Sequence, residues 1–300
     1  MGDHAMRLSE IEVVSPRTVE NALSVLHDRS GRIKAIAGST DAIIQLKDGS
    51  LQAKELLDIS SLRELRYIRK EESVIHIGAL STYSDIIESG VLNSSCRMLV
   101  DACRTIGSVQ IQNRATIGGN LGNASPAGDS IPPLYVLNAN VKIQRHEHSR
   151  LVPIEKFFLG YRKIDLMPDE LITEISFRAV EKPCDGMFLK LGPREGHCIS
   201  LVSLAICVRW VPDGDRFSDI RVALGAVAPV VFRARKCEEH LRNRTLSDDM
   251  IWNAGKIASG ESSPISDLRA SAEYRRAVIP SLLYKAVHAL IASQAGWEKP

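Results

Sequence analysis

Two short segments rich in small residues are the best candidates for chemistry in this sequence. Residues 116–120 read Thr-Ile-Gly-Gly-Asn, and residues 37–41 read Ala-Gly-Ser-Thr-Asp. Glycine lacks a Cβ, so its backbone can take positive φ angles and bring bare N–H groups close to an anion. Taken alone, Gly-Gly-Asn is equally typical of a hairpin turn. Because both segments follow apolar runs, we interpret them as two loops that clamp one diphosphate.

Composition excludes several other classes of function. The 300 residues include 38 Lys and Arg against 36 Asp and Glu, so the net charge of +2 gives no reason to expect a nucleic-acid partner. No apolar run is long enough to span a membrane. The six cysteines lack the close pairs typical of metal sites, and we expect reduced thiols. Residues 1–10 have no signal-peptide layout, so a cytoplasmic location is expected.

Hydrophobic periodicity predicts an α+β chain with a domain boundary near residues 180–186, where charged residues and a proline interrupt the pattern. The dinucleotide fingerprint of three spaced glycines is absent, which disfavours a Rossmann domain. Before the boundary we expect strands at 33–37, 56–59, 74–79, 139–143 and 171–177, with helices at 16–28, 82–90 and 99–106. After it we expect strands at 187–191, 200–210 and 220–227 and helices at 235–241, 250–257 and 274–291.

An ordered set of motifs resembles the FAD-binding medium subunits of molybdenum-containing hydroxylases, the xanthine dehydrogenase and carbon monoxide dehydrogenase group. The set covers nearly the whole chain and includes residues 37–41, 77–79, 106–108, 113–120, 125–133, 157–163, 169–172, 188–190, 267–269 and 274–276. The resemblance implies a two-part α/β FAD-binding domain at residues 1–180, of the PCMH type and not Rossmann, with subdomains of about 1–60 and 61–180. It also implies a smaller α+β domain at residues 186–300, with a three-stranded antiparallel sheet and helices.

The same resemblance assigns a set of cofactor-binding positions, with no catalytic side chain and no metal ligand. The FAD diphosphate is expected between the two glycine-bearing loops, with a carboxylate at the nucleotide, apolar contacts to the cofactor and a basic group near the flavin. The implied residues are Lys34, Ala35, Ile36, Ala37, Gly38, Ser39, Thr40, Asp41, Ile106, Thr116, Ile117, Gly118, Gly119, Asn120, Asp129, Ile172 and Lys190.

Several of these positions have simpler interpretations, which the sequence leaves open. Asp41 and Asp129 are also suitable caps for the segments that follow them, and Lys190 has Asp185 and Glu195 as possible ion-pair partners. Ser39 stands where the family usually has a second glycine. A serine there can still donate its N–H if φ stays negative, and its hydroxyl is a possible phosphate ligand.

The resemblance implies an electron-transfer subunit. Iron–sulfur and molybdopterin centres are expected on separate partner subunits, with FAD on this chain passing electrons to NAD or another acceptor. One alternative is a self-contained flavin oxidoreductase of the same superfamily, which would carry a catalytic acid at the flavin. The other is a non-catalytic FAD-binding assembly factor, for which absence of flavin in the purified protein would be evidence.

Overall fold

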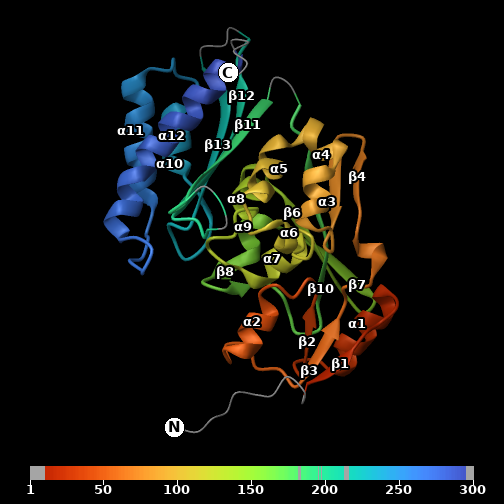
Figure 1. Cartoon of the computed structure of the whole chain (residues 1–300). Helices are drawn as coiled ribbons and strands as arrows, with labels where there is room; N and C mark the ends of the chain where they lie inside the picture. The colour runs from red at the N-terminus through yellow and green to blue at the C-terminus, as the bar shows by residue number, and fades with distance from the viewer. Residues whose placement is uncertain (1–10, 182–183, 195, 197, 213–215, 295–300) are drawn as a thin grey trace.

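The computed structural model describes residues 11–181, 184–194, 196, 198–212 and 216–294. Three parts follow one another along the chain (Figure 1). The N-terminal part is a small parallel sheet with two helices. The middle part is a five-stranded sheet with several short helices, and the C-terminal part is a four-stranded sheet covered by three helices. None of the described helices is long and apolar enough to cross a membrane.

The N-terminal part is a three-stranded parallel sheet in the order β1-β3-β2. Thr18 caps the helix α1, since its side chain accepts a hydrogen bond from Asn21 N, and the apolar stripe of α1 packs on one face of the sheet. Neighbouring residues of β3 point to opposite faces, so Leu57 joins the α1 side while Leu56 packs with Leu46 of α2. The elements are β1 (Glu12–Val14), α1 (Val19–Asp28), β2 (Ile33–Ile36), α2 (Ala42–Lys47) and β3 (Glu55–Asp58).

The middle part is built on an antiparallel sheet in the order β4-β5-β10-β6-β7. Its central strand β10 is almost wholly buried, and the short helices α3, α4, α5, α7 and α8 pack with the sheet in the largest core among the described residues. The strands are β4 (Ile68–Glu71), β5 (Val74–Gly78), β6 (Asn140–Arg145), β7 (His148–Pro153), β8 (Phe158–Gly160), β9 (Lys163–Ile164) and β10 (Leu171–Arg178). The helices are a 3₁₀ turn (Arg63–Leu65), α3 (Tyr83–Glu88), α4 (Gly90–Ser95), α5 (Arg97–Arg104), α6 (Val109–Gln112), α7 (Ile117–Asn123), α8 (Ile131–Val136) and α9 (Ile154–Phe157).

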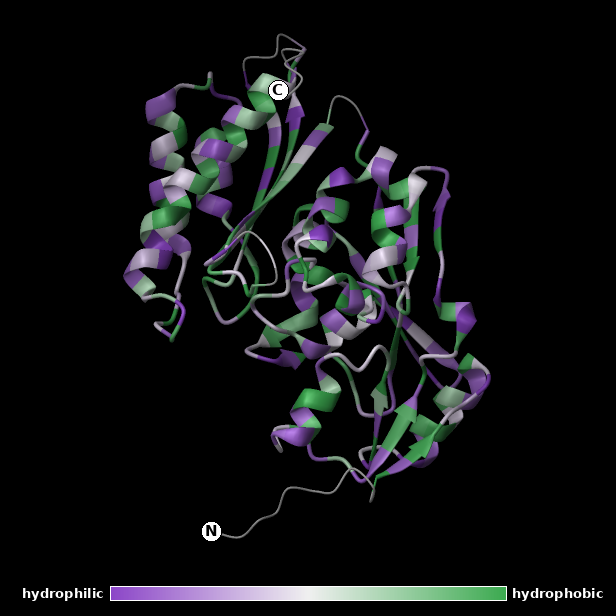
Figure 2. Cartoon of the chain, viewed as in Figure 1, coloured by the Kyte–Doolittle hydropathy of each residue, from purple (hydrophilic) through white to green (hydrophobic). Residues whose placement is uncertain are grey.

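The C-terminal antiparallel sheet, in the order β11-β12-β13-β14, is buried on both faces. Alternate residues of β12 belong to different cores: Leu204 and Ile206 pack with α10 to α12, whereas Ala205 and Cys207 join the core of the middle part. Figure 2 shows that α11 and α12 carry both hydrophobic and hydrophilic residues, as expected of helices with one buried face. The elements are β11 (Cys184–Leu191), β12 (Val202–Trp210), β13 (Phe217–Gly225), β14 (Phe232–Arg233), α10 (Arg235–Leu241), α11 (Asp248–Glu261) and α12 (Ala272–Gln294).

The predicted α+β class is confirmed, with differences in detail. Each predicted strand and helix has a counterpart, but the strands β1, β4, β7, β8 and β9 were not expected. The C-terminal sheet has a fourth strand, β14, beside the three predicted, because residues 232–233 pair with β13. The link between β12 and β13, where a turn was predicted, lies partly outside the described residues. The domain boundary near 180–186 stays a prediction.

Candidate functional site

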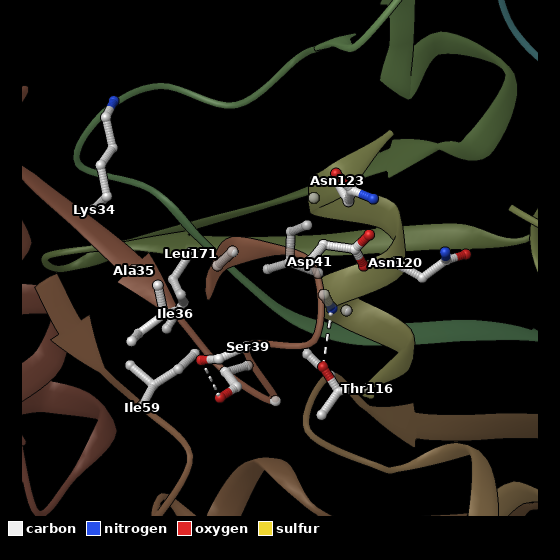
Figure 3. A pocket seen from close by; sticks show the side chains of 18 of the residues that line it. Lys34, Ala35, Ile36, Ser39, Asp41, Ile59, Thr116, Asn120, Asn123 and Leu171 are labelled. Atoms are coloured by element: carbon white, nitrogen blue, oxygen red, sulfur yellow. Dashed lines mark hydrogen bonds between the residues drawn. The ribbon is translucent and has the colours of Figure 1, made fainter. Parts of the chain in front are cut away.

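A cavity of about 490 Å³ lies between the N-terminal part and the middle part of the protein. Its lining comes from three stretches: the end of β2 with the following loop and α2, the start of α7, and the segment that leads into β10. Figure 3 shows the first two stretches facing each other, with Ser39 and Asp41 on one side and Thr116 and Asn120 on the other. The volume is within the range of sites for small molecules and cofactors.

The loop between β2 and α2 presents unused backbone donors to this cavity. The N–H groups of residues 37–41 have no hydrogen-bond acceptor among the described residues, although all five residues line the cavity. Residues 37–40 are half-buried and Asp41 is exposed, so water or a ligand can supply the acceptors that these N–H groups lack within the protein. Consecutive donors of this kind form a binding site for an anion such as a diphosphate.

Gly38 lets this loop touch the segment that precedes α7. A Cβ built on Gly38 would lie 1.8 Å from the carbonyl oxygen of Arg114, far closer than any real side-chain contact. Glycine is therefore required here for the close approach of two backbones, and not for a positive φ, since Gly38 is not among the positive-φ residues. The contact fixes the distance between the two segments that line the cavity.

Ser39 occupies the left-handed region of the backbone, with φ of 62°. The condition that its φ stays negative is therefore not met, and this position has the conformation for which glycine is normally selected. The hydroxyl donates a hydrogen bond to the carbonyl oxygen of Ala37 at 3.1 Å (Figure 3). That bond stabilises the turn locally and occupies the hydroxyl proton.

The Gly-Gly segment differs from the predicted turn. Gly118 and Gly119 lie in the first turn of α7, without positive φ, and Thr116 is the N-cap whose Oγ1 accepts from Gly119 N at 3.0 Å. The remaining amides of that turn are also used: Ile117 N donates to Ser81 O, Gly118 N to Ala79 O, and Asn120 N to Thr116 O. The interpretation as a loop with free donors was wrong, because Thr116 and the 79–81 segment already accept these hydrogen bonds.

Two of the glycines of α7, Gly118 and Gly119, have close neighbours where a Cβ would lie. A Cβ on Gly118 would lie 2.7 Å from the Cβ of Ala79, and a Cβ on Gly119 would lie 2.8 Å from Thr116 Oγ1. Both glycines line the cavity; Gly118 is buried against the 79–81 segment, whereas Gly119 is exposed. The start of α7 therefore supplies a close, side-chain-free surface, while most of the free donors come from the opposite loop.

The third wall of the cavity is the segment from Ile164 to Ile172, and Arg150 holds it in place. The guanidinium group of Arg150 donates to both carboxylate oxygens of Glu170, at 2.8 and 2.7 Å, and to Asp165 Oδ2 at 2.7 Å. Glu170 also accepts from Met167 N. Because Arg150 pairs with it, the pKa of Glu170 is lowered, so both ends of this wall segment are fastened to β7 by charged hydrogen bonds.

Gln45 and Asn123 connect the two facing stretches at the cavity. Gln45 Nε2 donates to Asn123 Oδ1 at 2.9 Å, and both residues line the cavity. Sequence analysis missed them, together with Leu166, Met167 and Pro168, because polar amides and loop residues carry no periodic signal. The strand predicted at 171–177 was the one indication in the sequence that the segment before it lies near the cavity.

Asp129 and Lys190 form a buried ion pair next to the cavity. Lys190 Nζ lies 2.7 Å from Asp129 Oδ2 and donates to the carbonyl oxygen of Thr105, the neighbour of the cavity residue Ile106. Ser200 donates to the other oxygen of Asp129, whose pKa is raised by burial against the opposing effect of Lys190. Neither side chain is in the cavity lining, and the carboxylate of Asp129 is engaged with Lys190 and Ser200, so Asp129 does not cap the following helix.

The structure thus gathers most of the residues predicted from sequence around one cavity. Residues 34–41, Ile106, Thr116, Gly118, Gly119, Asn120 and Ile172 line it, whereas Ile117 is fully buried in the core behind it. Asp41 precedes α2 but makes no side-chain cap, so the capping interpretation was wrong and its carboxylate faces the cavity. Glu195, considered as a partner of Lys190, lies outside the described residues.

Two family models match the chain. The FAD-binding domain of molybdopterin dehydrogenase matches residues 9–177, and the C-terminal domain of the CO dehydrogenase flavoprotein matches residues 187–290. The first match alone covers more than half of the chain and includes the cavity-lining residues.

Individual relatives match over nearly their whole length. The glyceraldehyde dehydrogenase medium chain of Sulfolobus acidocaldarius is 33% identical over 281 residues, which cover 92% of this chain and 97% of that one. The xanthine dehydrogenase FAD-binding subunit of Escherichia coli is 30% identical, covering 93% and 95% of the two chains. A solved structure of carbon monoxide dehydrogenase from Hydrogenophaga pseudoflava superimposes with a TM-score of 0.89 at 28% identity, covering 93% of this chain and 96% of that chain.

Proposed function

Because the chain belongs to the family of FAD-binding medium subunits of the xanthine and carbon monoxide dehydrogenases, we propose that it binds FAD in the cavity between its N-terminal and middle parts. The observation that carries the proposal is the row of backbone N–H groups at residues 37–41, which lack acceptors among the described residues and belong to residues that line the cavity. A diphosphate supplies the acceptors that these donors lack.

Different residues of the cavity suit different parts of FAD. The loop at residues 37–41 supplies donors for the diphosphate. Gly38 lets this loop lie against the segment that precedes α7, and Gly119 leaves the start of α7 without a side chain at the cavity. Ile106, Leu171 and Ile172 are apolar and suit a ring system. Arg150 and the Gln45–Asn123 hydrogen bond hold the walls in place, so the site is preorganised before the cofactor enters.

We further propose that the protein is the electron-transfer subunit of a molybdenum-containing dehydrogenase. FAD, when bound, supplies a group that accepts and releases one or two electrons, and the protein contributes binding and orientation. The relatives named as medium chains and FAD-binding subunits support the presence of partners. We expect an iron–sulfur subunit and a molybdopterin subunit among them, with NAD or another acceptor receiving the electrons.

The test is an absorption spectrum of the purified chain with and without added FAD, followed by anaerobic addition of NADH. Saturable FAD binding supports the assignment of the cavity, and reduction of the bound flavin by NADH supports NAD as the acceptor. Failure to bind FAD supplied in excess would contradict the proposal. FAD binding without reduction by NADH would leave the cofactor assignment intact and refute NAD.

A further inference from the structure

A second cavity, of about 400 Å³, lies at the junction between the middle part and the C-terminal part of the protein. Residues around β7 and α9 form one wall, and β13, β14 and α10 form the other. Its lining is dominated by basic side chains, namely Lys156, Arg221, Arg233, Arg235 and Arg242. None of these residues lines the cavity assigned to FAD.

The carboxylates near this cavity are too few to neutralise its basic groups. Glu155 lies between Arg235, at 2.6 Å, and Arg233, at 3.5 Å. Asp219 is likewise shared, at 3.3 Å from a nitrogen of Arg221 and 3.3 Å from a nitrogen of Arg242. With the buried Glu238, which pairs with Arg233, three carboxylates face five cations and leave an excess of two positive charges.

The basic groups also retain unused donors. The Nε atom of Arg242 is buried and has no hydrogen-bond acceptor among the described residues, and the buried Nε of Arg221 has only the ion-pair contact with Asp219 at 3.3 Å, which is not a hydrogen bond. Lys156 is exposed at the rim and makes no ion pair within the described part of the chain. Buried donors without acceptors are costly, so the shared Asp219 does not satisfy this cluster by itself. A bound acceptor with negative charge would remove both deficits.

We propose that this second cavity binds a small oxyanion with two negative charges, of the phosphate type. The planar guanidinium fork matches the oxygen geometry of phosphate, and four arginines of the β13, β14 and α10 wall line the cavity opposite Lys156 of the other wall. A cavity of this volume can hold a small ligand, whereas a contact with a flat protein surface would not need one. Because the two walls belong to different parts of the chain, the bound anion would also fasten the C-terminal part to the middle part.

The test uses the FAD-loaded full chain, so that the first cavity is filled, and titrates it with inorganic phosphate by calorimetry at low ionic strength. We expect saturable binding of phosphate and a rise in the unfolding temperature with its concentration. Lys156→Gln and Arg242→Gln should each weaken binding about tenfold, since each removes one charged contact. The matched controls Lys236→Gln and Arg244→Gln change exposed charges of the same kind outside the cavity and should bind as the wild type does.

Three results would overturn the proposal. The first is no saturable phosphate binding by the wild-type chain. The second is equal weakening by the control variants, which would indicate only a general charge effect. The third is weaker assembly of the two cavity variants with partner subunits in the absence of any phosphate binding, which would assign the cavity to an acidic group of a partner. Should Arg242→Gln not fold, Lys156→Gln decides, because Lys156 is exposed. If the chain binds no FAD, the dependence on Lys156 still distinguishes the two cavities.

Discussion

Replacing Gly38 with alanine tests the geometry of the FAD site most directly. The new Cβ would lie 1.8 Å from the carbonyl oxygen of Arg114 and 2.6 Å from its carbonyl carbon. Real Cβ atoms essentially never approach within 3.0 Å of another heavy atom, so the two backbones must separate by more than 1 Å. Both atoms that clash belong to the main chain, which means that a side-chain rotation cannot relieve the contact.

The size of the effect follows from that displacement. Forcing extra atoms into a packed contact costs about 1–3 kcal/mol. Because the substitution moves the loop that carries the free N–H groups relative to α7, we expect it to lower both the affinity for FAD and the free energy of unfolding. A loss of 1.4 kcal/mol in binding is tenfold in Kd, so the expected weakening is about tenfold to hundredfold.

The assay is an equilibrium titration of FAD into purified variant protein, with circular dichroism to check folding. Gly90→Ala is the matched control, because Gly90 lies in the middle part, has no positive φ, and its added Cβ would meet nothing within 4 Å. We expect Gly90→Ala to bind FAD like the wild type. A folded Gly38→Ala protein with unchanged Kd for FAD would refute the role of this contact in forming the site.

Three further predictions concern single side chains of the site. Ser39→Gly should raise the free energy of unfolding by about 0.5 kcal/mol in urea titrations, because the left-handed φ of 62° costs more than the lost hydroxyl hydrogen bond contributes. Lys190→Met should lower it by about 3 kcal/mol at pH 7, since the partner of a buried carboxylate is removed. Burial raises the pKa of Asp129 and Lys190 opposes this, so the pKa of Asp129 should rise further in the Lys190→Met variant. The loss in free energy of unfolding should therefore become smaller as the pH falls and Asp129 is protonated. Arg150→Lys should increase the dissociation rate of FAD several-fold in stopped-flow measurements, because lysine cannot replace the two-pronged contact with the carboxylate.

The sequence allowed the framework to be predicted because buried elements carry a period. The alternation of β12 and the apolar stripes of α10 to α12 determine which faces are buried, and those elements were predicted within a few residues of their ends. Short edge strands such as β1 and β4 are three and four residues long, which is too short for a period to be detected. Their pairing depends on neighbours distant in the sequence.

The conformation of the two glycine-bearing segments could not be predicted for a different reason. Glycine disfavours a helix by propensity, so residues 118 and 119 indicated a turn, but packing against Ala79 and the cap from Thr116 place them in α7. For Ser39 the sequence left open whether φ is negative, and the chain takes the left-handed conformation there. At Gly118 the deciding contact is with Ala79, which is far away in the sequence.

The two glycine-bearing segments are therefore unequal partners in one site. The donors of α7 are used inside the protein, which makes its position rigid, because each amide of its first turn is tied to the cap or to residues 79–81. The loop at residues 37–41 keeps its donors free and is held against that rigid edge by the contact at Gly38. A ligand with several acceptor atoms binds more tightly to such a loop, because the donors are already held in position before the ligand binds. We therefore expect residues 37–41 to be the main source of hydrogen bonds to a diphosphate, with α7 as the surface against which they are positioned.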